Sequence, residues 1–504
     1  MSLMLNWLAA SERARSFADE WQGDEPGGAI IGFDTNNVQF VQAGGLENLS
    51  TGTAFSADSV VRYASVTKHI FAAMALHHSD AVGLDDRLGD HLPELQKPLA
   101  DVSVGRALDM SGGLPDVREC LTLLGLSVYS ETHKQQLLNF LATLTRLNFD
   151  AGTDISYSNT GYRLVEAALE RKGFAFDDFI QNEIAGPLDI AFKAPDIWAE
   201  PVQGLAPGYL KTGNKWQLSA AGLHLSASGS LTGSGTSLAR WLQHLLTGSG
   251  KFSGLLAAFS AIRHLHDGRP SGYGLGLYWS RLADRYFVGH GGSHPGYKSH
   301  FLLDPEAGTG FVVVSNREDV NTSQIALAAM SALTALPLPQ TNCMLRDGFY
   351  VTEDGPHWIE LKHGVVSYLD AEETLYDDGN GWYLSRSASS PMRLRQTGAA
   401  IEGEAGYVQR RFLPVIPEPA SAELDGHWTA GEYGAHFDIR HGVVIMGAGP
   451  ARQFMPLLGL GNGRYLFTLD DGPWKKRICL NRLSEEKVEL VLSRSRVIEY
   501  TLMH

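Results

Sequence analysis

Cysteine is scarce in this 504-residue chain, which has only Cys120, Cys343 and Cys479. An odd number of widely spaced cysteines forms no disulfide framework and lacks the close ligand spacing of a zinc site. Reduced thiols are typical of the cytoplasm, so the composition predicts a cytoplasmic protein. The chain also has no HExxH sequence, no dense His/Cys cluster and no nucleotide-binding fingerprint. We therefore expect neither a metal nor a cofactor.

Long apolar segments and an excess of basic residues are also missing. The longest apolar runs, such as residues 310–315, are as long as a strand and too short to cross a membrane. The first residues, MSLMLNWLAASERAR, reach charged side chains before an apolar core of signal-peptide length, so we expect no secretory leader. Lys and Arg total 41 against 56 Asp and Glu, a net charge of −15. This acidity disfavours nucleic acid, whose phosphates require a basic surface.

The residues that are present indicate a folded, multidomain α+β protein. Hydrophobic residues make up 44% and charged residues 19% of the chain, whose length corresponds to about three domains. Apolar periodicity predicts helices at 5–22, 68–79, 132–145, 160–172, 236–247 and 322–335. Apolar runs that flank a polar turn predict strand pairs at 28–43 and 299–315. Strands towards both ends with helices between them predict one mixed domain over residues 1–335.

The rest of the chain contains an internal repeat. Residues 347–366 (DGFYVTEDGPHWIELKHGVV) align without a gap with residues 425–444 (DGHWTAGEYGAHFDIRHGVV), and NGWYL at 380–384 matches NGRYL at 462–466. Chance similarity between two β-rich stretches is the alternative, but the preserved order of the matching blocks argues against it. We predict two small antiparallel β-barrel domains, over residues 336–415 and 416–504.

Ser65 and Lys68 are the first candidate catalytic pair. Ser65 lies where a loop meets an apolar helical stretch, and a spacing of three residues puts both side chains on one helix face. Burial and the positive end of the helix both favour a neutral lysine, which is what a general base requires. The alternative is an ordinary helix start with a lysine in solvent. A second S-x-x-K, at 484–487, lies in a charged stretch and is interpreted as surface.

Three further motifs follow in order: Ser111-Gly112-Gly113-Leu114, Tyr157-Ser158-Asn159 and His290-Gly291-Gly292. A phenol near an ammonium is favoured as phenolate, so Tyr157 is a candidate proton shuttle, and Asn159 can hold a substrate amide. The glycines after His290 would let an acyl group approach a strand edge, where the N–H of about Ser293 joins that of Ser65 as an oxyanion hole. The alternatives are a buried tyrosine, a capping asparagine and a glycine turn.

The order Ser-x-x-Lys, Tyr-x-Asn and a third motif on an edge strand resembles the serine β-lactamases and penicillin-binding proteins. His-Gly-Gly in place of Lys-Thr-Gly is similar to class C-related esterases and peptidases. Two β-barrels after such a domain resemble bacterial D-aminopeptidases, which release an N-terminal D-residue, D-Ala above all. This resemblance implies a penicillin-recognising fold, a covalent serine mechanism without metal or cofactor, and a loop of the last domain that enters the cleft. The doubled glycine in Ser-Gly-Gly-Leu departs from the commoner Ser-Gly-Leu.

An aminopeptidase must also bind a free ammonium group. The sequence Asp470-Asp471-Gly472-Pro473 reads as the tip of a hairpin, and we predict that Asp470 or Asp471 pairs with that ammonium. A solvated acidic turn is the alternative.

Other functions remain open at this point. An esterase or β-lactamase-like hydrolase would use the same Ser-Lys-Tyr groups on another acyl substrate, whereas a non-catalytic peptide binder would need neither a base nor a proton shuttle. The expected partners are small peptides, amides or esters, without nucleic acid or membrane, and a homodimer is one option for the oligomeric state.

Overall fold

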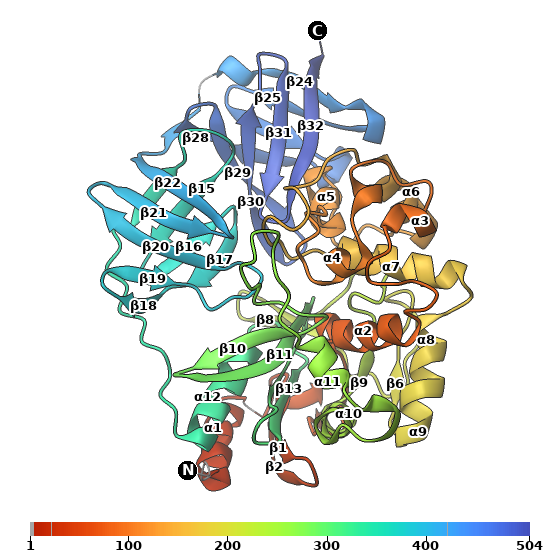
Figure 1. Ribbon diagram of the computed structural model, residues 1–504. Coiled ribbons are helices and arrows are strands. Elements are labelled where there is room, and N and C mark those ends of the chain that lie inside the picture. Colours follow the sequence, from red (N-terminus) through yellow and green to blue (C-terminus); the bar gives the residue numbers. More distant parts are fainter. Residues whose placement is uncertain (1–4, 22, 421, 504) are drawn as a thin grey trace.

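The computed structural model describes residues 5–21, 23–420 and 422–503, so residue 22 of the expected helix 5–22 lies outside the described part. The first part of the chain contains a six-stranded antiparallel sheet in the order β10-β11-β12-β13-β1-β2 (Figure 1). Its strands are β1 (Gly28–Asp34), β2 (Val38–Gly44), β10 (Tyr278–Leu282), β11 (Arg285–His294), β12 (Tyr297–Asp304) and β13 (Thr309–Ser315). Strands from both ends of the domain meet at β1 and β13, and both expected strand pairs are confirmed.

The central strands are buried on both faces, because successive side chains of a strand point to opposite sides. Ile30 and Val313 pack under helices α1 (Trp7–Ala18) and α12 (Thr322–Thr334). Their neighbours Ile31 and Val314 belong to the large core on the other face. Continuous apolar runs such as AIIGF and GFVVVS therefore mark strands that are covered twice.

Helices fill that second face. Those at 67–77, 134–143, 159–171 and 235–247 lie close to expected segments, whereas those at 104–108 and 117–123 were not predicted. The main ones are α2 (Thr67–His77), α4 (Val104–Leu108), α5 (Val117–Leu123), α6 (Lys134–Thr143), α7 (Asn159–Arg171) and α10 (Gly235–Thr247). Helix α2 is buried along nearly its whole length, so its first turn lies inside the protein.

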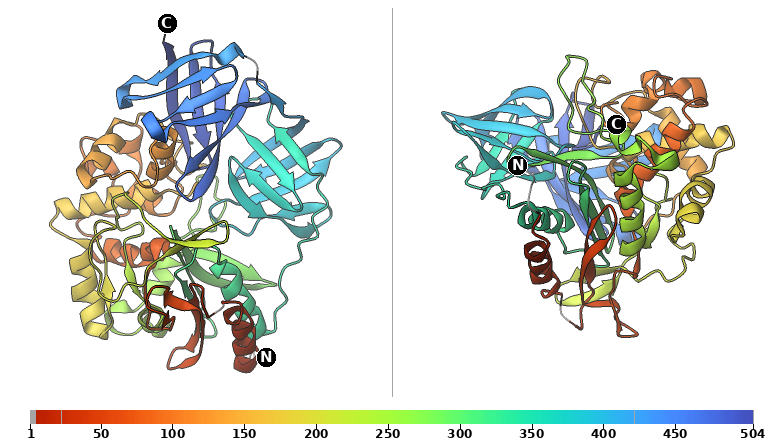
Figure 2. Two further views of the ribbon diagram at one scale, coloured as in Figure 1. Left: turned by 180° about the vertical axis from the view of Figure 1, so that it is seen from behind. Right: turned by 60° about the horizontal axis from the view of Figure 1, so that its bottom comes forward.

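Two large antiparallel sheets form the rest of the chain (Figure 2). The nine-stranded sheet contains β14 (Gly348–Val351), β15 (Trp358–Lys362), β16 (Val365–Tyr368), β17 (Ala371–Thr374), β18 (Tyr376–Gly379), β19 (Trp382–Leu384), β20 (Met392–Thr397), β21 (Ala400–Ala405) and β22 (Val408–Val415). The ten-stranded sheet contains β23 (Glu418–Pro419), β24 (Gly426–Ala430), β25 (Ala435–Arg440), β26 (Val443–Met446), β27 (Gln453–Pro456), β28 (Leu458–Gly461), β29 (Arg464–Asp471), β30 (Trp474–Arg482), β31 (Lys487–Leu492) and β32 (Ser495–Met503). Apart from β23, the strands follow one another in the same order in both sheets, with β14 matching β24 and β22 matching β32.

The repeated residues perform the same structural task in both sheets. The carboxylate of Asp347 accepts a hydrogen bond from the backbone N–H of His363 at 3.0 Å, and Asp425 does the same for His441 at 2.8 Å. Both histidines have a left-handed backbone, with φ of 51° and 52°, at the start of a tight His-Gly turn. The Asp of the Asp-Gly pair and the His of the His-Gly pair thus form the same hydrogen bond at a tight turn in both copies of the repeat.

The second sheet packs directly on the first domain. Trp428 and Phe437 belong to the same core as residues of α5, and the hydroxyl of Tyr500 donates to the carbonyl of Leu123 at 2.8 Å. The chain ends at the far side of this sheet from the N-terminus (Figure 1). Because the core is continuous, the turns of the second sheet hold fixed positions over the first domain.

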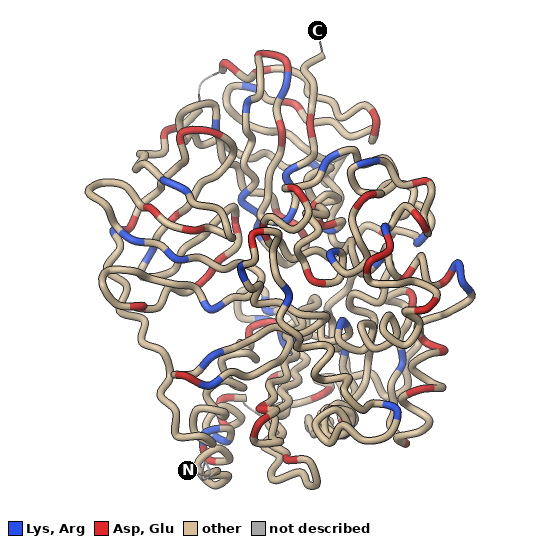
Figure 3. The backbone as a smooth tube through the Cα atoms, in the orientation of Figure 1, with Lys and Arg blue, Asp and Glu red and all other residues tan. Residues whose placement is uncertain are grey.

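Along the backbone, Lys and Arg residues are interspersed with Asp and Glu residues throughout the fold (Figure 3). Among the described residues, no helix has both the length and the apolar character to cross a membrane, and no cluster of His, Cys, Asp and Glu is arranged to hold a metal ion.

Candidate active site

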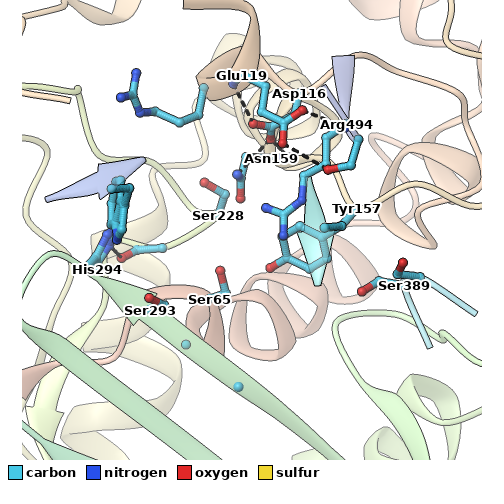
Figure 4. Close-up of a pocket in the computed structure, with 18 of the residues that line it drawn as sticks. Ser65, Asp116, Glu119, Tyr157, Asn159, Ser228, Ser293, His294, Ser389 and Arg494 are labelled. Carbon is cyan, nitrogen blue, oxygen red and sulfur yellow. Dashed lines mark hydrogen bonds between the residues drawn. The ribbon is translucent and has the colours of Figure 1, made fainter. Parts of the chain in front are cut away.

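Ser65 lies at a sharp corner between a strand and a helix. The chain leaves β5 (Val60–Arg62) and enters a single 3-10 turn, Ala64–Val66, which continues into α2. Ala64 has a φ of 50°, which L-residues other than glycine adopt at some cost. Such a turn holds the serine side chain at the end of the helix, where it faces the cleft together with Tyr157 (Figure 4).

Lys68 is completely buried beside Ser65. Its Nζ lies 3.2 Å from Ser65 Oγ, 2.9 Å from Asn159 Oδ1 and 2.7 Å from the carbonyl oxygen of Ser228. Burial lowers the pKa of Lys68 well below its usual value, against the opposing charge of Asp116. A neutral amine donates two hydrogen bonds, which match Asn159 and Ser228, and its lone pair then faces the Ser65 hydroxyl. This geometry fits a general base.

Asn159 connects Lys68 to a buried carboxylate. Its side-chain Nδ2 donates to Asp116 Oδ2 at 2.9 Å, and its backbone N–H donates to the same oxygen at 2.8 Å. Asp116 is itself the N-cap of α5. The sequence interpretation gave Asn159 a substrate amide as partner, whereas here its amide already has partners on both sides and orients Lys68.

Tyr157 lies over the same pocket as a neutral phenol. Burial raises its pKa above the usual value, although Ser65 and the positive charge of Arg494 oppose this effect. This raised pKa runs against the expectation that Tyr157 is favoured as a phenolate, because burial disfavours the charged form. The Tyr157 hydroxyl is buried without a hydrogen-bond partner among the described residues, so it is free to donate to a reacting group.

Gly292 brings strand β11 against Ser65. Strand β10 pairs with β11 only as far as Gly289, which leaves the next residues of β11 with one open edge towards Ser65. A Cβ at position 292 would meet the carbonyl oxygen of Tyr63 at 2.0 Å and the backbone nitrogen of Ser65 at 3.1 Å. The close approach of the two backbones requires glycine. The oxyanion hole predicted between Ser65 and β11 stays a prediction.

Substitution of Gly292 by alanine should therefore separate β11 from Ser65. We expect kcat to fall by about 100-fold or more, the effect of losing one oxyanion donor, because the clash with Tyr63 is with rigid backbone. Gly291→Ala is the matched comparison: its added Cβ would meet first a side-chain nitrogen, His300 Nδ1, at 3.1 Å, and should cost much less. Steady-state kinetics with a chromogenic ester and a thermal melt of each variant measure this. Equal losses in the two variants would contradict the assignment.

His290 and Ser293 have other neighbours. His290 is buried, with its Nε2 2.8 Å from the hydroxyl of Tyr273, and burial lowers its pKa well below the usual value, so it is neutral. Ser293 Oγ accepts a hydrogen bond from Lys298 Nζ at 2.6 Å. His290 thus anchors β11 through its contact with Tyr273, and Ser293 lies at the open edge of that strand. Their predicted roles in substrate binding stay predictions.

The hairpin tip at 470–473 reaches the rim of the same cavity, through Asp471 and Trp474. The Asp471 carboxylate is buried and engaged by Arg118, by Thr122 Oγ1 at 2.8 Å and by the N–H of Val128 at 2.7 Å. Asp470 is largely exposed and pairs with Lys475 at 2.6 Å. Both carboxylates thus have protein partners, and these contacts dock the tip on α5. Their predicted pairing with a substrate ammonium stays a prediction.

The cavity over Ser65 has a volume of about 950 Å³ and is lined by all three parts of the chain. Its wall includes Glu373 from β17 and Arg494 from the turn between β31 and β32, neither of which has a sequence motif. Burial raises the pKa of Glu373 to about 7, against the effects of Ser387 and the charge of Arg494. The sequence analysis missed both residues, and Asp116 and Ser228 as well, because only the folded chain brings them to the catalytic pair.

This fold and this Ser-Lys-Tyr-Asn geometry define a serine hydrolase of the penicillin-recognising class. Residues 12–335 match the family described as Beta-lactamase, and the chain belongs to that family. The resemblance inferred from the motifs is confirmed, and so is the fold class: a β-lactamase-like domain followed by two barrel-like antiparallel sheets.

Several characterised proteins are similar to this chain. A D-aminopeptidase of Brucella anthropi is 23% identical over 400 residues, which cover 76% of this chain and 71% of that protein. The octameric penicillin-binding protein homologue from Pyrococcus abyssi has a TM-score of 0.57 at 18% identity, with 97% of this chain and 99% of that one covered. The D-amino acid amidase from Ochrobactrum anthropi SV3, in complex with L-phenylalanine amide, has a TM-score of 0.54 at 18% identity, with 65% and 98% covered.

Proposed function

We propose that the protein is a serine hydrolase that forms an acyl-enzyme and releases an N-terminal D-amino acid, such as D-Ala, from small peptides or amides. The observation that carries the chemistry is the buried Lys68 amine held between Ser65, Asn159 and Ser228. The D-aminopeptidases among its relatives support the choice of substrate.

In the acylation step, Ser65 Oγ attacks the carbonyl carbon of the scissile amide, and its proton passes to Lys68 Nζ. The backbone N–H groups of Ser65 and of Ser293 hold the oxyanion. Collapse of the tetrahedral intermediate breaks the C–N bond. Tyr157 donates its phenolic proton to the departing amine and is reprotonated by Lys68.

In the deacylation step, a water molecule attacks the ester carbonyl of the acyl-enzyme. Its proton passes to Lys68, either directly or through Tyr157, and then to Ser65 Oγ as the ester bond breaks. The product is the free D-amino acid, and Ser65 and Lys68 return to their starting protonation states. No metal or cofactor takes part in these steps.

We infer that Glu373 binds the substrate ammonium in place of Asp470 or Asp471, because both of those carboxylates already have protein partners. It lines the cavity, it is partly buried, and among the described residues no basic side chain stands within ion-pair distance of it. An ammonium group next to this carboxylate would restore the charge that burial disfavours. As the pH falls through about 7, Glu373 gains a proton and loses its attraction for the ammonium, so KM should rise on the acidic side.

The substrate class is tested with four compounds: D-Ala- and L-Ala-p-nitroanilide, 4-nitrophenyl acetate and a cephalosporin. The proposal expects D-Ala-p-nitroanilide to be cleaved well ahead of its L-isomer. Glu373→Gln should raise the KM for D-Ala-p-nitroanilide by about 10-fold and leave 4-nitrophenyl acetate unaffected, since the acetyl group has no ammonium. Glu402→Gln, a carboxylate of the same sheet that pairs with Arg411, serves as the control. Turnover of the ester or the cephalosporin alone would favour the alternative esterase or β-lactamase-like function.

Assembly and location remain proposals. The octameric neighbour from Pyrococcus abyssi makes self-association of this chain a reasonable expectation, with the homodimer as one form. Size-exclusion chromatography with light scattering measures it. The cytoplasmic location rests on the three unpaired cysteines.

A further inference from the structure

Arg494 is held in the catalytic cleft by its own backbone. Its N–H donates to Glu119 Oε2 at 2.6 Å, and its carbonyl oxygen accepts from the N–H of Asp116 at 2.8 Å and from Asn148 Nδ2 at 2.9 Å. The first two bonds tie the turn between β31 and β32 to the start of α5, and the third ties it to the loop after α6. The same segment, through Asp116, orients Asn159 and Lys68. The position of Arg494 relative to Ser65 is therefore built into the fold.

The guanidinium group of Arg494 has no charged partner. Its carbon lies 4.7 Å from the centroid of the Tyr157 ring, and Figure 4 shows the side chain beside Tyr157 and directed towards Ser65. Among the described residues, no carboxylate lies within 4.0 Å of it, and no hydrogen bond to its side chain is formed. Two arginines of the domain interfaces differ in this respect: Arg118 pairs with Asp471, and Arg477 pairs with Glu360.

A half-buried, unpaired guanidinium in a cavity is suited to bind an anion. Its planar set of N–H donors matches a carboxylate in two parallel hydrogen bonds. A charged guanidinium that is removed from water without an ionic partner is unfavourable in free energy. An anionic ligand would supply the missing ion pair. Arg494 lies on the Tyr157 side of Ser65, which is the side of the leaving amine if Tyr157 is the proton donor.

We propose that Arg494 binds a free carboxylate on the leaving group, so that the preferred substrates are D-aminoacyl dipeptides whose C-terminal carboxylate directly follows the scissile bond. This inference rests on the proposed hydrolase function and narrows it. A residue of extended chain spans about 3.3–3.6 Å, so a guanidinium stacked on Tyr157 is within reach of the first leaving residue and not of a distant chain end.

The test compares substrates that differ only in this charge: D-alanyl-glycine, D-alanyl-glycinamide and D-Ala-p-nitroanilide. The wild-type enzyme should prefer D-alanyl-glycine over its amide in kcat/KM. Arg494→Gln should lower kcat/KM for D-alanyl-glycine by about 10- to 100-fold, mainly through KM, and change the two uncharged leaving groups little. Arg494→Lys should recover part of the loss, since it keeps the charge and loses the planar fork. Lys487→Gln removes an exposed cation of the same sheet and serves as the control.

Two results would overturn the proposal. One is a wild-type enzyme that does not distinguish the peptide from its amide. The other is an equal loss on all three substrates in Arg494→Gln, which would mean that the guanidinium acts on Tyr157 or Lys68 and not on the substrate. Thermal melts of both variants separate these outcomes from misfolding.

A pair of esters tests the role of Arg494 independently of the proposed D-aminopeptidase activity. 4-Nitrophenyl acetate and 3-carboxy-4-nitrophenyl acetate carry no ammonium and differ in a leaving-group carboxylate. An enzyme that cleaves the esters but no D-Ala substrate contradicts the D-aminopeptidase activity, whereas the ratio of the two esters, in wild type and in Arg494→Gln, still tests Arg494.

Discussion

Replacement of Ser65 by alanine should lower kcat by about four to six orders of magnitude, because the covalent step and the proton transfers that depend on it are lost together. The variant should fold, since the serine side chain contacts Lys68 without being part of the apolar core. Mass spectrometry gives the direct measurement: an acyl adduct should accumulate on Ser65 with a slow ester substrate and be absent from the variant.

The chain contains its own control for this experiment. Ser484 and Lys487 reproduce the Ser-x-x-Lys spacing, but they are exposed in the turn before β31. Ser484→Ala should be fully active. A fully active Ser65→Ala enzyme would rule out the mechanism in which Ser65 is the nucleophile.

Replacement of Lys68 by arginine should lower kcat by about three orders of magnitude or more, because a guanidinium keeps its proton at every accessible pH and is no base. The larger side chain also does not fit between Asn159 and Ser228, so thermal melts accompany the kinetics. Lys487→Arg is the matched control and should behave like wild type.

The pH dependence tests the same base without any mutation. Burial lowers the pKa of Lys68 and so favours the neutral amine, and activity should fall as the pH decreases through that lowered pKa. An ester substrate isolates this acidic limb from the ammonium contact at Glu373. A rate that stays flat to low pH, combined with an active Lys68→Arg enzyme, would show that another group is the base.

Local sequence patterns were sufficient to predict most of the main helices and strands and the candidate catalytic pair. Apolar periodicity located α2 and α7, and continuous apolar runs located β1 and β13, because both faces of those strands are covered. The spacing of Ser65 and Lys68 was enough to put them on one helix face. The repeat at 347–366 and 425–444 predicted two similar sheets, since each copy has to form the same turn contact between its Asp and its His.

Such local patterns could not predict contacts between segments that are distant in the sequence. Asn159 and Lys68 are 91 residues apart, and Arg494 and Glu119 are 375 residues apart, so nothing local in the sequence relates them. The pKa of Tyr157 runs against the prediction for the same reason, since it is raised by burial, which local sequence does not show. Asp470 and Asp471 were correctly placed at a hairpin tip, but their partners Lys475 and Arg118 are visible only in the folded chain.

The sequence by itself determined the candidate nucleophile and base, the strand that approaches them and the repeated sheets, because each of these depends on residue types at short, fixed spacings. The tertiary structure alone decided which charges surround the reacting bond. Burial and the charge of neighbours set pKa values and partners, and both arise only when the two C-terminal sheets close over the cleft with Glu373 and Arg494 in its wall.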